Sequence, residues 1–90
     1  MANTQNTVTV QSTSATLVLA ANTWRRGFNV YNNSSVIVYL GFDTTVTTSN
    51  GTPILPNASF TSDGYHPWKS NVYAIAASST ADVRYLEWTK

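Results

Sequence analysis

The sequence predicts an all-β domain: an antiparallel β-sandwich of jelly-roll-like type, or a small barrel, with about seven or eight short strands. Three observations predict this class. Short alternating or apolar segments recur along the chain, turn-forming residues separate them, and no window shows the 3.6-residue apolar period of a helix. The chain has 90 residues, the size of one domain, and no cysteine for a disulfide.

The first two expected strands cover residues 7–11 and 15–21. Residues 7–11 alternate between valine and polar residues, as in a strand with one face in the core. Residues 3–6 are polar, and the segment 1–6 lacks this alternation. We therefore expect a flexible N-terminal arm over 1–6 and a single β domain over 7–90.

The next part of the chain predicts a connection and then a hairpin. Residues 22–27 are expected to connect, and strands are expected over 28–31 and 36–42. The Asn- and Ser-rich residues 32–35 between them predict a turn that joins the two strands.

Turn residues mark the region that follows. Asn50-Gly51 is the strongest short-range signal of a tight hairpin, because both residues tolerate positive φ. Pro53 and Pro56 cannot donate to a strand ladder, so the segment between them is expected to be an edge strand or an extended loop. Residues 58–60 are expected to form another strand.

The last third of the chain predicts one more strand pair. A turn is expected at residues 63–64 and an aromatic loop at 65–68. Strands are then expected over 72–77 and 81–88, joined at 78–80.

Three segments are apolar on both faces: residues 15–21, 36–42 and 72–77. An antiparallel strand with one wet face should alternate instead. In a chain of this size one face can lie against the core, so we expect a second subunit to cover the other. The alternative is that the extra apolar residues are small or lie at strand ends.

The low content of charged residues excludes several functions. Charged residues make up 10% of the chain and the net charge is +1, whereas about 25% is typical. Only Arg25 and Arg26 are adjacent basic residues, too few for a nucleic-acid interface. No apolar run can span a bilayer and no signal peptide is recognisable, so we expect neither a membrane nor export. Such a neutral surface repels copies weakly, which favours a chain that sits among neighbours.

Catalytic and metal-binding patterns are weak. His66 lies three residues from Asp63, but no nucleophile motif accompanies it, so a loop histidine is the simpler interpretation. The other carboxylates, Asp43, Asp82 and Glu87, are too scattered for glycoside hydrolysis. The chain has no cysteine and a single histidine, too few for a zinc site, and it lacks the spacing of a calcium-binding loop. We expect no enzyme, no cofactor and no metal.

Aromatic residues and the arginine pair are the candidates for recognition. Exposed rings can stack on sugars, pack at the centre of a protein interface, or fill the core. The arginine pair can meet a partner's carboxylate or simply be solvated. The candidate interface residues are Trp24, Arg25, Arg26, Tyr31, Tyr65, Trp68 and Trp88.

A series of short motifs runs through most of the chain, from about Ala15 to Glu87. The motifs are Ala20-Ala21-Asn22, Arg26-Gly27-Phe28, residues 30–34, residues 38–41, Gly51, Leu55-Pro56, residues 72–76, and Val83-Arg84 with Leu86-Glu87 behind it. This order resembles small virion structural proteins of tailed bacteriophages. Asn57 stands where such chains often carry glycine, and asparagine tolerates the same left-handed conformation.

The resemblance implies a β-sandwich or jelly-roll-like decoration (cement) protein on the capsid exterior. Such a viral protein would be made in the host cytoplasm, bind the major capsid protein and stabilise the shell by non-covalent contacts. Similar proteins are often homo-oligomers, with trimers favoured, and none of their residues is catalytic. A carbohydrate-binding module, or a tail- or fibre-associated β module, is the alternative.

Overall fold

The structure is a computed structural model that describes residues 3–63 and 68–89. Within these residues the chain forms strands and no helix, so the prediction of an all-β domain is confirmed. In chain order the strands are β1 (Asn3–Gln11), β2 (Thr16–Leu19), β3 (Arg25–Asn32), β4 (Val38–Gly41), β5 (Thr52–Ile54), β6 (Ser59–Asp63), β7 (Val72–Ala76) and β8 (Thr80–Thr89).

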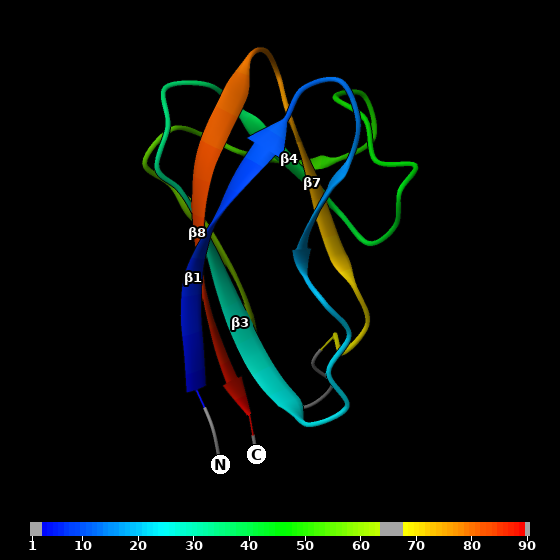
Figure 1. Cartoon of the computed structure of the whole chain (residues 1–90), viewed down its shortest axis with the longest axis vertical. Coiled ribbons are helices and arrows are strands. Elements are labelled where there is room, and N and C mark those ends of the chain that lie inside the picture. The colour runs from blue at the N-terminus through cyan, green and yellow to red at the C-terminus, as the bar shows by residue number, and fades with distance from the viewer. Residues whose placement is uncertain (1–2, 64–67, 90) are drawn as a thin grey trace.

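The strands form two antiparallel sheets of four strands each. Sheet I has the order β1-β8-β3-β6, and sheet II has the order β2-β7-β4-β5. Figure 1 shows β1, β8 and β3 in one layer and β4 and β7 in the other, with both chain ends at the same end of the molecule. Each sheet is open at two edges, which gives a two-layer, sandwich-like arrangement.

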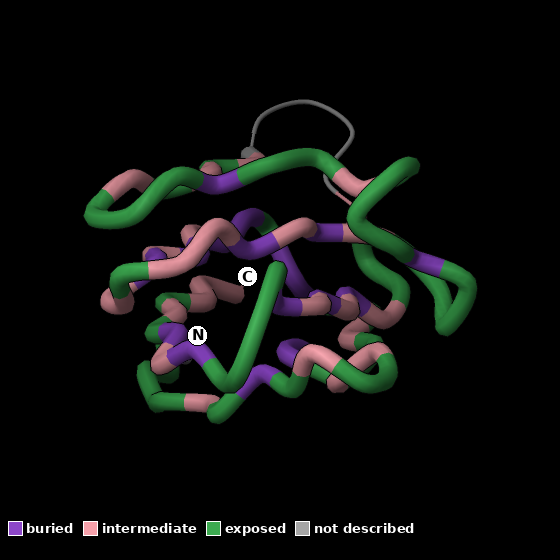
Figure 2. The backbone as a smooth tube through the Cα atoms, turned by 90° about the horizontal axis from the view of Figure 1, so that it is seen from above, coloured by how far each residue is buried: buried purple, intermediate pink, exposed green. Residues whose placement is uncertain are grey.

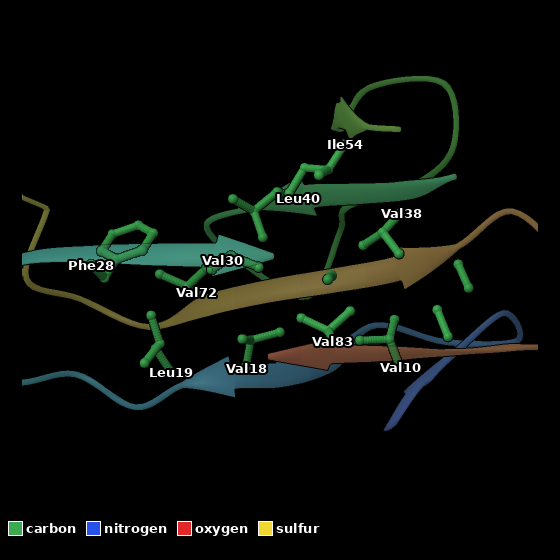
Figure 3. Packing of buried hydrophobic residues seen from close by; sticks show 13 residues of the cluster. Val10, Val18, Leu19, Phe28, Val30, Val38, Leu40, Ile54, Val72 and Val83 are labelled. Atoms are coloured by element: carbon green, nitrogen blue, oxygen red, sulfur yellow. The ribbon is translucent and has the colours of Figure 1, made fainter. Parts of the chain in front are cut away.

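The core lies between the two sheets. Buried side chains of Val10, Phe28 and Val83 from sheet I join those of Val38 and Val72 from sheet II in one cluster. Figure 3 shows these side chains pointing toward one another from strands of both sheets. In Figure 2 the buried positions lie mainly along the strands, while the connecting loops are mostly exposed.

A β-bulge explains part of the apolar segment at residues 15–21. Leu17 pairs with Tyr73 and Leu19 pairs with the adjacent Val72, so Val18 is an extra residue on β2. The bulge lets Val18 and Leu19, two consecutive residues, both point into the core and be buried. This segment therefore needs less external cover than its sequence suggests.

The two expected hairpins over residues 28–42 and 72–88 are wrong. Strand β3 lies in sheet I and β4 in sheet II, and β7 and β8 are likewise in different sheets. The buried Asn32 holds the first of these crossings. Its Nδ2 donates to the carbonyl oxygens of Val36 and Ile54, both at 2.8 Å, and its Oδ1 accepts from Ser34 Oγ at 2.6 Å. Crossing between sheets lets consecutive strands contribute to the same core.

The prediction of a flexible N-terminal arm is wrong for residues 3–6. These residues belong to β1 and pair with β8 without a register shift, from Asn3 opposite Trp88 to Gln11 opposite Thr80. Their polar composition fits a strand whose outer face and free edge are both in water. Residues 1–2 lie outside the described part of the chain. The expected connection over 22–27 is also too long, because β3 begins at Arg25.

The predicted tight hairpin at Asn50-Gly51 is wrong, because residues 42–51 form a longer connection between β4 and β5. Gly51 ends this loop, where its N–H donates to Thr47 O at 2.9 Å. A Cβ on Gly51 would come 2.7 Å from Tyr39 Cβ, so the loop packs closely on β4. Glycine is needed here for close approach rather than for a two-residue turn.

The proline-rich segment behaves as predicted. Strand β5 is the edge strand of sheet II and contains Pro53. Asn57 has a φ of 64°, and Ala58 N–H donates to Leu55 O at 2.9 Å. Proline followed by a residue of positive φ is the pattern of a type II turn, and asparagine is one of the residues that adopt this conformation. Of the turn expected at residues 63–64, Asp63 ends β6 and residue 64 lies outside the described residues, as does most of the loop expected at 65–68.

Candidate functional site

Each carboxylate whose side chain is described contacts another residue of the chain. Glu87 pairs with Arg25 at 2.6 Å, and Asp82 lies 3.6 Å from Arg84. Asp43 accepts from the hydroxyl and the N–H of Thr45, and these two bonds lower the pKa of Asp43. No group of three metal-ligating side chains occurs within the described residues. No helix in the described part of the chain is long and apolar enough to cross a membrane.

Arg25 is a structural clamp and is not available to a partner, which corrects its place among the candidate interface residues. Its side chain is fully buried and stacks over Phe28, with Cζ 5.5 Å from the ring centroid. Besides Glu87, the guanidinium donates to the carbonyl oxygens of Ala20, Trp68 and Ser70 at 2.6–3.0 Å. The Arg25 side chain thus connects the loop after β2 and the segment before β7 to strand β8.

The other two residues beside Arg25 point outward. Trp24 is 65% exposed, although its N–H is held by Asn22 Oδ1 at 3.0 Å. Arg26 is also exposed, because it is the extra residue of a bulge between Arg25 and Gly27. Trp24 and Arg26 therefore form an aromatic and basic projection at the start of β3.

Trp68 is a packing residue. Its ring stacks on Phe42 at 4.0 Å between centroids with a 21° tilt, and its Nε1 donates to Asn71 O at 2.9 Å. It also packs against the core cluster. The stack attaches the loop after β4 to the segment that precedes β7.

The outer face of sheet I carries Trp88 and Tyr31. Trp88 stands beside Gly27 in the ladder, and a Cβ on Gly27 would fall 2.5–2.7 Å from three indole atoms. The indole therefore lies flat over the glycine, with one ring face on the sheet. Leu86, two residues before Trp88 on the same face, is 48% exposed.

Two shallow grooves adjoin these side chains and share Gln5 and Leu86. One groove, of about 410 Å³, extends past Asn29 to Tyr31, and the other, of about 490 Å³, reaches Trp88. Carboxamide, hydroxyl and aromatic groups dominate the lining. Arg84 also lines the first groove and Glu87 the second, so each groove combines hydrogen-bonding groups and the apolar Leu86 with one charged residue.

The outer face of sheet II is apolar and uncharged. Ladder pairing places Leu17 beside Tyr73, and places Tyr39 between Ile75 and Pro53. These five residues define the sheet II face. Leu17 is 44% exposed, Pro53 is exposed, and the other three are half-buried.

The chain covers part of this side by itself. A Cβ on Gly41 would lie 2.5 Å from Val46 Cβ, so the buried Val46 sits directly over β4. The loop 42–51 therefore does some of the covering that we expected from a second subunit. The sheet II face remains as the uncovered part.

The structure does not gather the candidate interface residues on one surface. Trp24 and Arg26 project at the start of β3, Tyr31 and Trp88 lie on sheet I, and Trp68 packs inside. Tyr65 lies outside the described residues.

Four exposed apolar side chains were not among the candidate interface residues, although the segments 15–21 and 36–42, expected to be apolar on both faces, contain two of them. These are Leu17, Phe42, Leu55 and Leu86. Strict alternation along residues 81–88 could have identified Leu86, because it puts Leu86 and Trp88 on the face opposite Val83. Phe42 and Leu55 follow their strands in loops, where no period applies.

No family model matches the chain, and no curated protein or solved structure matches it either.

Proposed function

We propose that this chain is a virion structural protein of a tailed bacteriophage, a decoration protein that binds the outside of the capsid as a homo-oligomer and stabilises the shell. It would be made in the bacterial cytoplasm and act by contact alone, without catalysis. The motif series that resembles such proteins supports this proposal. The observation that carries it is the sheet II face, an uncharged apolar surface of Leu17, Tyr39, Pro53, Tyr73 and Ile75.

The sheet II face is chemically suited to adhesion. Flat apolar and aromatic side chains without charge lose little on leaving water, and they gain contact area at low entropic cost. Each copy contributes a modest contact, and repetition around a symmetric shell multiplies it into strong retention. The low overall charge suits a molecule packed against many neighbours.

We further propose that the two sheets are connected as a jelly roll, the fold of many capsid proteins. A jelly roll can be described as a long hairpin whose arms pair throughout and then roll up. The pairs β1–β8, β2–β7, β3–β6 and β4–β5 support this description, because each joins strands at equal distances from the middle of the series.

Co-sedimentation with shells assembled from the phage's major capsid protein tests the function. Wild-type chain should pellet with the shells. Leu17→Glu combined with Ile75→Glu places charge on the sheet II face and should weaken binding about tenfold or more. Ser59→Glu combined with Thr61→Glu adds the same two charges at exposed positions of sheet I and should bind like wild type. No pelleting of folded wild-type chain would refute the decoration role.

A carbohydrate-binding role is the second candidate, and the flat indole of Trp88 over Gly27 favours it. The free face of the indole can receive the C–H face of a sugar ring, while Gln5 and Asn29 can bond its hydroxyls. Titration with a panel of neutral oligosaccharides tests this role by tryptophan fluorescence. Quenching that is lost in Trp88→Ala but kept in Trp24→Ala would support it, and no response across the panel would exclude it.

A further inference from the structure

Strand β1 is an unusual edge. Sheets I and II have four edge strands, and three of them are poor templates for another strand. β5 has three residues and contains proline, β2 has four residues and a bulge, and β6 has five residues. β1 has nine residues in unbroken register and contains no charge, no proline and no glycine. Proteins usually protect an edge strand by keeping it short or by placing charges, proline or a bulge in it, and β1 has none of these features.

Figure 1 shows β1 at the outer side of sheet I, with β8 on its other side. Two side-chain contacts show which backbone groups face outward. Thr7 N–H donates to Asn6 Oδ1 at 2.8 Å, and Gln11 N–H donates to Thr16 Oγ1 at 3.0 Å, so neither donates to β8. In an antiparallel ladder alternate residues bond to the same neighbour. The odd-numbered residues of β1 therefore point their N–H and C=O groups to the free edge.

We propose that this edge pairs with β1 of a second copy of the chain, antiparallel and related by a two-fold axis. Gln11 is already closed off by Thr16, which leaves residues 3–9 to pair. Centring the axis at Asn6 sets Asn3 opposite Thr9 and Gln5 opposite Thr7. Each such pair exchanges two N–H···O bonds, and the Asn6 carboxamide gives up its contact with Thr7.

A second copy fits this edge better than an unrelated strand. A two-fold interface needs a surface complementary to itself. An antiparallel edge has this property, because each residue supplies one donor and one acceptor. Residues 3–9 contain no charge, so pairing two copies creates no like-charge contact. The result is a dimer whose two copies of sheet I form one continuous sheet.

This inference rests on the homo-oligomer part of the proposed function and not on shell binding. It predicts a dimer in place of the trimer that the resemblance implies. A chain that binds shells as a monomer would overturn the pairing alone, whereas a β1-paired dimer that ignores shells would overturn the decoration role alone.

Sedimentation equilibrium of the full chain over a concentration series tests the pairing. The expected mass is twice 9.8 kDa, falling toward one chain on dilution. Thr7→Pro removes an outward N–H without touching the ladder to β8, so the variant should stay folded by circular dichroism and become monomeric. A wild-type monomer at millimolar concentration, or a trimer, would overturn the proposal.

Charge variants supply a test that does not depend on proline. Gln5→Lys with Thr7→Lys sets like charges opposite each other across the axis and should raise the dimer dissociation constant about tenfold. Gln5→Lys with Thr7→Glu sets opposite charges there and should restore dimerisation. Thr48→Lys is the control for added charge and should dimerise like wild type. Equal dissociation constants for the two double variants would overturn the pairing.

Discussion

Replacing Arg25 with methionine should destabilise the fold more than any surface change. Methionine keeps an unbranched side chain in place of the aliphatic part of Arg25, but it lacks the guanidinium and removes five contacts. Glu87, which is 11% exposed, loses its partner at 2.6 Å. The carbonyl oxygens of Ala20, Trp68 and Ser70 lose their donor, and the ring of Phe28 loses its cation.

The magnitude follows from these contacts. Removing one partner of a buried ion pair costs about 3–5 kcal/mol, because the other charge stays buried without compensation. Domains are stable by only about 5–15 kcal/mol, so the loss is a large fraction of the total. For a domain of this size each kcal/mol lowers Tm by about 4–8 °C, and Arg25→Met should therefore lower Tm by about 12–40 °C.

Urea unfolding followed by circular dichroism measures this cost. Arg26→Met is the matched control, because Arg26 is exposed and should change stability by about 0.5 kcal/mol or less. Arg25→Met combined with Glu87→Leu removes both charges and should be less destabilised than Arg25→Met alone. A cost below about 1 kcal/mol for Arg25→Met would refute the clamp.

Two further predictions concern Gly27 and Asp43. Gly27→Ala puts a Cβ into the Trp88 ring and should lower the free energy of unfolding by about 1–3 kcal/mol. It should also shift the indole N–H resonance of Trp88. An unshifted resonance at wild-type stability would contradict the flat packing. The pKa of Asp43 is lowered in the folded chain, so its bonds to Thr45 contribute stability above the unfolded-state pKa and lose it as pH falls through the folded one. Carboxyl NMR titration should give a midpoint below the ordinary aspartate value, rising in Thr45→Ala but not in Thr44→Ala.

Local patterns predicted the strands well and their partners poorly. The strands predicted over residues 72–77 and 81–88 end within one position of β7 and β8, and Pro53 correctly marked an edge. The period of a strand is a property of its own residues. Which sheet a strand joins depends on contacts distant in sequence, so the two expected hairpins failed.

For the candidate residues too, the local sequence did not reveal the contacts with distant parts of the chain. Trp24 beside a basic pair suggested a loop in solvent, but one arginine of the pair is the most buried charge in the described chain. Its partner Glu87 points inward because it alternates with Leu86 and Trp88. Nothing in the sequence near Arg25 marks Glu87 as a partner. The bulge in β2 is likewise invisible in sequence, since an extra apolar residue looks the same as a second apolar face.

The sheet II face, Leu17 to Pro53 across four strands, is the surface on which the proposed role depends. Electron-microscopy reconstruction of capsid shells incubated with the purified chain tests that role most directly. We expect ordered additional density on the outer surface of the shell, with the β2-β7-β4-β5 sheet facing the shell. Shells that show no added density at saturating concentrations of folded chain would contradict it.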